Sequence, residues 1–449
     1  MRNQNEFVGK KVLVLGLAKS GFAAAELLHS LGANVLVNDS SPEEGNKEAE
    51  VLRSKGIEVI CGGHPESILD NGFELIVKNP GIPYNNPVLQ QAVQKKIPIW
   101  TEIELAYLVS EAPIIAITGS NGKTTTTTLL YHILNIGGKK PLIAGNIGTV
   151  ACSVAEKAKE DELIVMEVSS FQLAGTEKFR PKIAVWTNLY DAHIDYHGTP
   201  EDYAIAKSKV TNNQTKEDFF IYNADQPEMR PYIDQSNATK IPFSLKGKSA
   251  IGISADDEMI YWQGEPFVKR SIIKLLGQHN LENILAATAS AILMDCDKET
   301  IENVLSSFTG VRHRMQFVKE LKGRTFYNDS KATNTLATKS ALSSFQPPVI
   351  LIAGGLDRGH SFEELRPYMG RLKALVALGE TADRLIEFAE SCGVPIVKKV
   401  QTMDAAVQEA YGISIQGDQI LLSPACASWD QFPNFEERGD AFIEAVGRL

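Results

Sequence analysis

Short apolar runs rich in β-branched residues recur along the chain, and each ends in glycine or a small polar residue. Helical stretches lie between many of them, at residues 23–31, 125–136 and 281–293. Strands that alternate with helices are typical of parallel sheets covered on both faces. The pattern therefore predicts an α/β protein with strands at residues 12–15, 35–37, 76–77, 114–117, 163–166, 183–186, 349–352 and 420–422.

The length of the chain predicts several domains. At roughly 150 residues per domain, 449 residues correspond to about three. Breaks after residue 100 and near residue 310 favour domains at 1–105, 106–310 and 311–449. Residues 216–275 are a patchwork of short β-like pieces and turns, which we interpret as an excursion from the central sheet.

Composition and charge exclude several classes of protein. The chain carries 45 Lys+Arg against 55 Asp+Glu, a net charge of −10, which disfavours a general binder of nucleic acid or anionic lipid. The five cysteines are far apart and form no C-x-x-C pair, which fits a reducing cytoplasm. Apolar runs stay well below the roughly 18 residues of a membrane span. We therefore expect a cytoplasmic protein without a membrane span.

A glycine-rich turn after the strand at 114–117 predicts a phosphate-binding loop. Gly119 and Gly122 allow backbone N–H groups to converge on an anion, and a helix follows. Lys123 supplies a positive charge for the phosphates, and Thr124 offers a hydroxyl group to Mg²⁺. This segment predicts that the second domain binds a nucleoside triphosphate.

Polar residues follow two further strands of the same domain. Glu167 ends an apolar strand, where a buried carboxylate is costly unless it faces a cation such as Mg²⁺. His193 follows the strand at 183–186, although imidazole is an unusual Mg²⁺ ligand. We expect both to be metal ligands.

The first domain begins like a Rossmann unit. Gly16 and Gly21 follow the first strand, and Asp39 stands at about the spacing of a ribose-binding acid. Ala18 replaces the middle glycine of G-x-G-x-x-G, so a nucleotide-bearing ligand is favoured over a dinucleotide. In the third domain, loops at 326–334 and 421–435 are rich in hydrogen-bonding groups, which turns alone would also explain.

Spaced motifs over nearly the whole chain resemble those of the Mur ligases, and most closely those of the members that add D-glutamate. They occur in the family's order: Thr118-Gly-Ser-Asn-Gly-Lys-Thr124, Gly145-Asn-Ile-Gly148, Glu167-Val-Ser-Ser-Phe-Gln172, Asp191-Ala-His193, His279-Asn280, Arg312-His-Arg314, Asn328-Asp-Ser-Lys-Ala-Thr-Asn334 and Ser423-Pro-Ala-Cys-Ala-Ser428.

The resemblance implies a fold and an activity. It implies a Rossmann-like N-terminal domain for the UDP-sugar, a central P-loop ATPase-type domain with a mostly parallel sheet, and a Rossmann-like C-terminal domain for the incoming amino acid. The implied enzyme is an ATP-dependent ligase that adds D-glutamate to UDP-N-acetylmuramoyl-L-alanine through an acyl phosphate. It would release ADP and phosphate, act as a monomer in peptidoglycan precursor synthesis, and use these three small molecules as partners.

The resemblance also implies cofactors and catalytic residues. ATP would be accompanied by two Mg²⁺ ions and by a CO₂-derived carbamate on Lys207, within Tyr203-Ala-Ile-Ala-Lys207. The implied catalytic residues are Lys123, Glu167, His193 and Lys207. The implied metal ligands are Thr124, Glu167, His193 and Lys207.

Three sets of binding residues follow from the same motifs. The implied ATP contacts are Gly119, Ser120, Asn121, Gly122, Lys123, Thr124, Thr125, Asn280, Asn283, Arg314 and Asp329. The implied UDP-substrate contacts are Ser20, Asp39, Ser40, Asn79, Asn146, Ser169 and Gln172. The implied D-glutamate contacts are Lys331, Thr333, Arg358, Ser428 and Phe435. At Gly354-Gly-Leu-Asp357-Arg358 the chain departs from the Gly-Asp-Gly-Lys form of some D-glutamate-adding members. Arg358 would replace the lysine of that form, because guanidinium pairs well with carboxylate.

Alternatives from three classes stay open. Another Mur ligase or a folylpolyglutamate synthase would share the ATP site. A switch GTPase needs Asn-Lys-x-Asp, whereas Asn46-Lys47 is followed by Glu48 and Ala49. An NAD-dependent dehydrogenase built on the first domain is disfavoured by the absent middle glycine.

Overall fold

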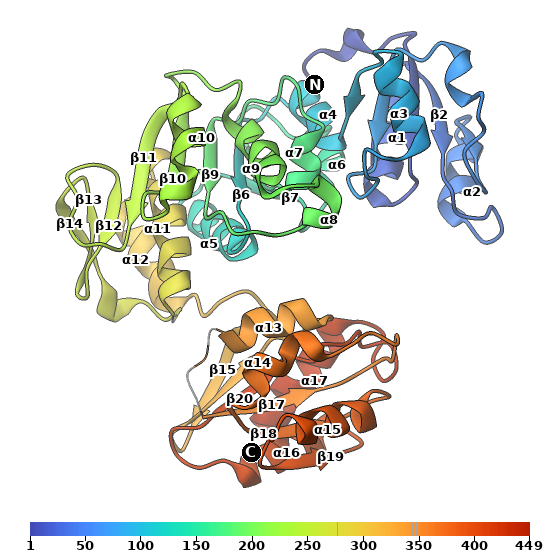
Figure 1. Ribbon diagram of the computed structural model, residues 1–449. Coiled ribbons are helices and arrows are strands. Elements are labelled where there is room, and N and C mark those ends of the chain that lie inside the picture. Colours follow the sequence, from blue (N-terminus) through green and yellow to red (C-terminus); the bar gives the residue numbers. More distant parts are fainter. Residues whose placement is uncertain (276, 344, 346–347) are drawn as a thin grey trace. The chain divides into compact units, whose positions relative to one another are not determined.

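The computed structural model describes residues 1–275, 277–343, 345 and 348–449, and the described chain forms two compact units (Figure 1). The first unit comprises Met1–Ile273 and Gln278–Ser307, and the second comprises Lys274–Gly277 and Phe308–Leu449. Strands and helices alternate in both units, so the predicted α/β class is confirmed. Within the described ranges, no helix is long and apolar enough to cross a membrane.

The N-terminal sheet of the first unit is parallel throughout, with the order β3-β2-β1-β4-β5. Val12 and Val14 pack into one apolar core, and Leu13 and Leu15 pack into another, so both faces of β1 are buried. The strands are β1 (Lys11–Leu15), β2 (Asn34–Asn38), β3 (Glu58–Ile60), β4 (Leu75–Lys78) and β5 (Ile99–Trp100). The helices between them are α1 (Lys19–Ser30), α2 (Lys47–Ser54) and α3 (Pro87–Gln94).

The other sheet of the first unit, the central sheet, has the order β14-β13-β12-β11-β10-β9-β6-β8-β7. Its strands are β6 (Ile114–Thr118), β7 (Pro141–Gly145), β8 (Leu163–Glu167), β9 (Ile183–Trp186), β10 (Phe219–Asn223), β11 (Thr239–Ser244), β12 (Ile253–Ala255), β13 (Met259–Trp262) and β14 (Glu265–Lys269). Its helices are α4 (Glu102–Val109), α5 (Lys123–Ile136), α6 (Ala151–Ala155), α7 (Ser170–Ala174), α8 (Ile194–His197), α9 (Pro200–Ser208), α10 (Arg230–Gln235), α11 (Gln278–Leu293) and α12 (Lys298–Ser307).

Residues 216–275 extend this sheet, so their interpretation as an excursion from it is wrong. β10 pairs in parallel with β9, with Phe219 opposite Ile183, and β11 and β12 continue the parallel order. An antiparallel hairpin of β13 and β14 then forms the edge. The strands are short and separated by turns, and their pairing with β9 is a tertiary contact, which is why sequence periodicity did not reveal it.

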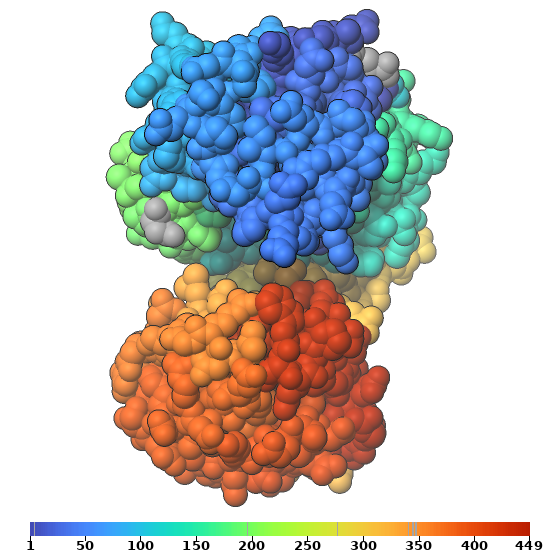
Figure 2. Space-filling model, turned by 90° about the vertical axis from the view of Figure 1, so that its right-hand side faces the viewer, coloured from blue at the N-terminus to red at the C-terminus, as the bar shows by residue number. Residues whose placement is uncertain are grey.

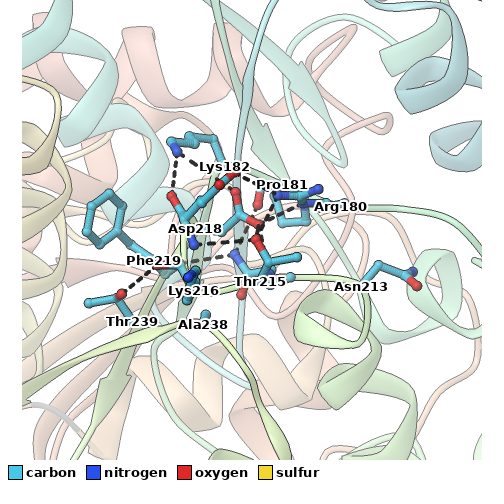
Figure 3. Close-up of polar contacts among 12 residues, drawn as sticks. Arg180, Pro181, Lys182, Asn213, Thr215, Lys216, Asp218, Phe219, Ala238 and Thr239 are labelled. Carbon is cyan, nitrogen blue, oxygen red and sulfur yellow. Dashed lines mark hydrogen bonds and ion pairs between the residues drawn. The ribbon is translucent and has the colours of Figure 1, made fainter.

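An ion-paired network joins the amino ends of β9, β10 and β11 (Figure 3). Asp218, only 4% exposed, accepts hydrogen bonds from Arg180 Nε at 2.7 Å and from the backbone N–H of Thr215 at 2.9 Å. Lys182 Nζ lies 3.9 Å from the same carboxylate, and Thr239 N–H donates to the Asp218 carbonyl. Because β6 and β9 are parallel, this edge is opposite the phosphate loop, and the network stabilises the sheet.

The sheet of the second unit has the order β15-β16-β20-β17-β18-β19 and is parallel except for β15 against β16. Two apolar cores lie against this sheet. Helices α16 and α17 contribute to one core, and helices α13, α14 and α15 contribute to the other. The C-terminal segment (red) lies directly beside the orange part of this unit (Figure 2). The elements are β15 (Gln316–Leu321), β16 (Arg324–Asn328), α13 (Thr335–Ser343), β17 (Val349–Ala353), α14 (Arg366–Met369), β18 (Leu372–Ala377), α15 (Ala382–Ser391), β19 (Val397–Lys399), α16 (Met403–Ile413), β20 (Gln419–Leu422) and α17 (Phe435–Gly447).

The predicted strands all lie within observed strands, and each predicted helical stretch falls on α1, α5 or α11. The domain boundaries stay a prediction. The predicted joint between residues 105 and 106 falls inside α4, and the second unit resumes at Phe308, close to the joint at 310.

Candidate active site

The phosphate loop connects β6 to α5 and requires both of its glycines. Gly119 has φ +145°, and a Cβ atom there would lie 1.9 Å from Thr187 Oγ1. Gly122 has φ +82°, and a Cβ atom there would lie 2.0 Å from Asn283 Oδ1. These backbone conformations and contacts exclude side chains at both positions, so no Cβ atom of Gly119 or Gly122 blocks the approach of an anion to the start of α5.

The two residues directly after β9 form hydrogen bonds with the phosphate loop. Ser120 N–H donates to the Asn188 carbonyl at 3.0 Å, and Asn121 N–H donates to Asn188 Oδ1 at 2.8 Å. Thr187 Oγ1 donates to the Asn121 carbonyl at 2.6 Å. Sequence analysis missed Thr187 and Asn188, although they are polar residues directly after an apolar strand, the same signal that identified Glu167.

Lys123 and Lys207 converge on this loop. Lys123 Nζ donates to the carbonyl oxygens of Gly119 at 2.9 Å and Ser120 at 3.0 Å. Lys207, on α9 and only 1% exposed, donates to the Gly119 carbonyl at 2.8 Å. Burial and the nearby charge of Lys123 hold the pKa of Lys207 well below its usual range, while Glu167 acts in the opposite direction.

Glu167 ends β8 beside the start of the loop, with Ile117 opposite it in register. Its side chain is buried, and Asn146 Nδ2 donates to Oε1 at 2.8 Å. Oε2 is buried and, among the residues described, has no hydrogen-bond partner. A buried carboxylate oxygen without a donor fits a cation, and Thr124, 4% exposed, lies on the first turn of α5.

The predicted metal ligands do not form a cage of protein side chains alone. In the described part of the chain, no group of three His, Cys, Asp or Glu residues could hold a metal ion. A divalent ion at Glu167 would therefore share the hydroxyl of Thr124 and oxygens from phosphate and water, which is how Mg²⁺ is commonly bound beside nucleotides.

His193 stands at the start of α8 in an aromatic cluster. Its backbone is left-handed (φ +55°), and its ring centroid lies 4.9 Å from that of Phe171. His197, at the end of the same helix, stacks on Phe171 and bonds to Ser170 Oγ at 3.0 Å. Burial, with the nearby charges of His193 and Lys207, lowers the pKa of His197 to about 4. Sequence analysis did not single out His197.

Ser169 and Gln172 form a capping box at the start of α7. Gln172 Oε1 accepts from Ser169 N–H and Ser169 Oγ, both at 3.0 Å, and its Nε2 donates to Glu102 Oε1 at 3.1 Å. Glu102 is 2% exposed, and burial raises its pKa to about 7. The structure therefore unites these two predicted substrate residues and adds Glu102, which fixes the Gln172 amide.

The predicted ATP contacts are divided between the units. Asn283 on α11 touches the loop at Gly122 and bonds to Asn280 at 3.4 Å. Arg314 and Asp329 lie in the second unit, where Ser423 Oγ donates to Asp329 at 2.9 Å. Burial raises the pKa of Asp329 to about 7, and the Arg314 charge opposes that shift.

The predicted UDP-end residues meet at the carboxyl edge of the N-terminal sheet. Leu15 lies opposite Asn38 and Lys78 in register, so the loops after β1, β2 and β4 start side by side. Asp39 accepts from the N–H groups of Leu17 at 2.5 Å and Ser41 at 2.7 Å. Asn79 packs closely against the turn after β1: a Cβ atom at Gly16 would lie 2.8 Å from the Cβ atom of Asn79. Ser20 on α1 and exposed Ser40 complete this edge.

Four of the predicted D-glutamate residues lie on the loops after β16, β17 and β20, which are neighbouring strands, and the fifth, Phe435, begins α17. Lys331 Nζ lies 5.6 Å from the centre of the Phe435 ring. The Arg358 guanidinium lies 4.7 Å from the ring of Trp429, the residue after buried Ser428. Thr333 follows Lys331 on the first of these loops and donates its N–H to the Lys331 carbonyl.

Comparison with known proteins identifies the family. Three family models match: the MurD-like N-terminal domain of Mur ligases at residues 10–101, the Mur ligase middle domain at 117–291 and the Mur ligase glutamate ligase domain at 313–426. The UDP-N-acetylmuramoylalanine--D-glutamate ligases of Bacillus cereus (strain B4264) and Bacillus mycoides (strain KBAB4) are each 54% identical over all 449 residues, which is 100% of both chains.

Solved structures share the fold. The chain is similar to the UDP-N-acetylmuramate-alanine ligase MurC of Thermotoga maritima, with a TM-score of 0.56 and 20% identity over 98% of this chain and 99% of that one. It is also similar to the MurF ligase of Thermotoga maritima in complex with ADP, with a TM-score of 0.56 and 16% identity over 100% and 97%. The full-length identity to the Bacillus ligases and the three matching domains together establish that this chain belongs to the Mur ligase family.

Proposed function

We propose that this Mur ligase uses ATP to join D-glutamate to UDP-N-acetylmuramoyl-L-alanine in peptidoglycan precursor synthesis. The glycine loop, with Lys123 on it and Glu167 beside it, carries the proposal. Lys123 would offset phosphate charge, and Glu167 Oε2, which has no hydrogen-bond partner among the described residues, suits the Mg²⁺ that accompanies a triphosphate. The full-length similarity to the UDP-N-acetylmuramoylalanine--D-glutamate ligases of Bacillus supports the choice of substrates. The same full-length similarity favours ligation over a switch GTPase or a dehydrogenase.

A carboxylate is a poor electrophile and must be activated before an amine can attack it. An oxygen of the alanyl carboxylate attacks the γ-phosphorus of ATP, the bond to the β-phosphate oxygen breaks, and ADP leaves. The D-glutamate amine then attacks the acyl carbon, phosphate leaves, and the nitrogen loses its proton. Lys123 and the N–H groups at the start of α5 offset the negative charge that gathers in the first step.

Thr124 and Glu167 would hold Mg²⁺ at the phosphates, and His193 would help to hold a second ion. When bound, these ions neutralise phosphate charge and bring the two anionic reactants together. Glu167 Oε2, which is buried and has no hydrogen-bond partner within the described ranges, supports the first position. His193 is exposed, and its assignment to the second ion rests on the family resemblance alone.

Lys207 would act as a carbamate. Its buried amine has a lowered pKa, and a neutral amine can attack CO₂ to form a carbamate with release of one proton. A carbamate is an anionic oxygen ligand, whereas an ammonium group at this position would repel a cation. Burial beside Lys123 therefore favours the modified form.

We assign the remaining predicted contacts by domain. Residues 1–105 would bind the UDP-sugar, residues 106–310 would bind ATP, and residues 311–449 would bind D-glutamate. We further propose that the enzyme acts as a monomer in the cytoplasm.

The product identifies the reaction. Purified enzyme with Mg²⁺, ATP, UDP-N-acetylmuramoyl-L-alanine and D-glutamate should yield the UDP-linked dipeptide by mass spectrometry. L-Glutamate, L-lysine and meso-diaminopimelate serve as competing amino acids. Equal ligation of a different amino acid, or of a folate acceptor, would contradict the assignment.

A further inference from the structure

Lys78 is a buried cation at the boundary between the N-terminal sheet and the helices of the central sheet. It is the last residue of β4, and 1% of its surface is exposed. It forms no ion pair with any residue that the structure describes, and burial alone lowers its pKa to about 7. A buried ammonium group without a carboxylate is costly to fold, so its surroundings call for explanation.

The loop that follows β4 wraps around this side chain. Lys78 Nζ donates to the carbonyl oxygens of Asn79 at 3.3 Å, Pro80 at 3.1 Å and Ile82 at 2.9 Å. The ring of Tyr84 lies 5.0 Å from the same nitrogen. Lys78 therefore determines the path of the loop at residues 79–82, which packs on the turn after β1 at Gly16.

A fourth oxygen beside Lys78 Nζ comes from α8. Tyr196 OH lies 2.9 Å from Lys78 Nζ, and the carbonyl oxygens of Pro80 at 2.9 Å and Ile82 at 3.2 Å are alternative acceptors for its single proton. The Tyr196 ring contacts Phe171 at 4.3 Å between centroids, and Phe171 also contacts the His193 ring. One buried nitrogen thus connects the loop after β4 to the helix that begins directly after His193.

We propose that Lys78 is a positioning residue that holds the loop at residues 79–82 against α8, so that binding of the UDP end of the substrate and placement of His193 are coupled. The proposal rests on the proposed function, because it takes Asn79 as part of the UDP-binding edge. It assigns no contact between Lys78 and the substrate.

The kinetic constants separate this role from a purely structural one. Lys78→Met removes a buried ammonium group but leaves the carbonyl oxygens of Asn79, Pro80 and Ile82 without its N–H donors, so these two effects on stability oppose each other. The deciding result is therefore which KM changes, and not the Tm. Lys78→Met should raise the KM for UDP-N-acetylmuramoyl-L-alanine about tenfold, the scale of one substrate hydrogen bond lost when Asn79 is displaced. The KM for ATP should change less than about twofold.

The experiment compares full-length Lys78→Met, Tyr196→Phe, the double variant and a control, Lys95→Met. Lys95 follows α3 and forms an ion pair with Asp70 on the surface. Asp70 precedes the amino end of β4, whereas Lys78 is at its carboxyl end. The double variant should raise the KM for the UDP substrate by less than the product of the single effects, because both variants break the same contact. Tyr196→Phe removes only the hydroxyl group that contacts Lys78, so it tests the connection between the loop and α8 even if Lys78→Met does not fold.

Three results would overturn the proposal: an unchanged KM for the UDP substrate in both single variants, equal increases in all three KM values with a lower Tm, or effects in the double variant that multiply fully. Failure of the proposed function is distinguishable, since the wild type and Lys95→Met would then be inactive with these substrates.

Discussion

Lys123 Nζ and Lys207 Nζ donate to the same backbone carbonyl oxygen, that of Gly119, at 2.9 and 2.8 Å. Two ammonium groups around one acceptor repel each other, and the buried one has the lowered pKa. An anionic carbamate on Lys207 would replace this repulsion with attraction to Lys123 and to bound cations. We therefore expect the loop and Lys207 to act as one charge system, in which a change at either lysine alters phosphate binding.

Lys207→Ala removes the proposed carbamate. We expect turnover to fall about 100-fold or more, because an anionic ligand of the Mg²⁺ that would offset phosphate charge is lost. Added formate or acetate should restore part of the activity by filling the space with a carboxylate. Exposed Lys216→Ala is the control. Steady-state phosphate release checks this, and wild-type turnover without any additive would exclude the role.

Lys123→Ala removes the positive charge that we propose for the phosphates. We expect kcat to fall about 100-fold or more. The variant should keep its fold, since Lys123 is only partly buried and its bonds are to nearby loop carbonyls. Phosphate release and circular dichroism measure the two effects, and near-normal turnover in folded protein refutes the assignment.

Glu167→Gln preserves shape but removes the charge. The Mg²⁺ concentration needed for half-maximal activity should rise on the order of 10–100-fold. Without Mg²⁺ the variant should be at least as stable as the wild type, because the buried oxygen lacks a donor among the described residues. Metal titration of activity and thermal unfolding test both halves. An unchanged Mg²⁺ requirement would show that Glu167 is not a ligand.

Glu102 predicts a pH dependence of stability. Burial raises its pKa from 4.5 to about 7, so the folded state binds the proton more tightly than the unfolded chain. This contribution is complete below pH 4.5 and is lost as the pH rises to about 7, a change of about 3 kcal/mol. Glu102→Gln should flatten the dependence in urea unfolding, while exposed Glu160→Gln should not. Identical pH profiles for wild type and Glu102→Gln would count against a buried, protonatable carboxyl group.

Asp218→Ala separates stability from catalysis. It leaves Arg180 without its buried partner at the edge of the sheet opposite the phosphate loop. The free energy of unfolding should fall by about 2–3 kcal/mol. At a temperature where the variant is folded, kcat should stay within about twofold of the wild type. Urea unfolding and phosphate release test this, and a selective loss of kcat would place the network in the active site.

Local patterns revealed the parts of the site that lie at strand ends. Gly119, Gly122 and Glu167 follow apolar strands, and parallel pairing of β6 with β8 brings them together. The same logic applies to Lys78, which also ends an apolar strand. Its significance depends on Tyr196, 118 residues away, so the sequence alone gave no reason to single it out.

Other features depend on tertiary packing. The burial of Lys207 follows from how α9 packs beside the loop, and the bonding of Gln172 to Glu102 joins residues 70 positions apart. The continuation of the central sheet through β10–β14 depends on pairing with β9 rather than on local periodicity. Strand and helix positions could therefore be predicted, whereas the partners of buried charges could not.

Oxygen transfer tests the central claim most directly. With UDP-N-acetylmuramoyl-L-alanine labelled with ¹⁸O in its alanyl carboxylate, D-glutamate-dependent turnover should deliver one labelled oxygen to each released phosphate. Formation of the dipeptide product with phosphate free of label would contradict activation of that carboxylate by ATP.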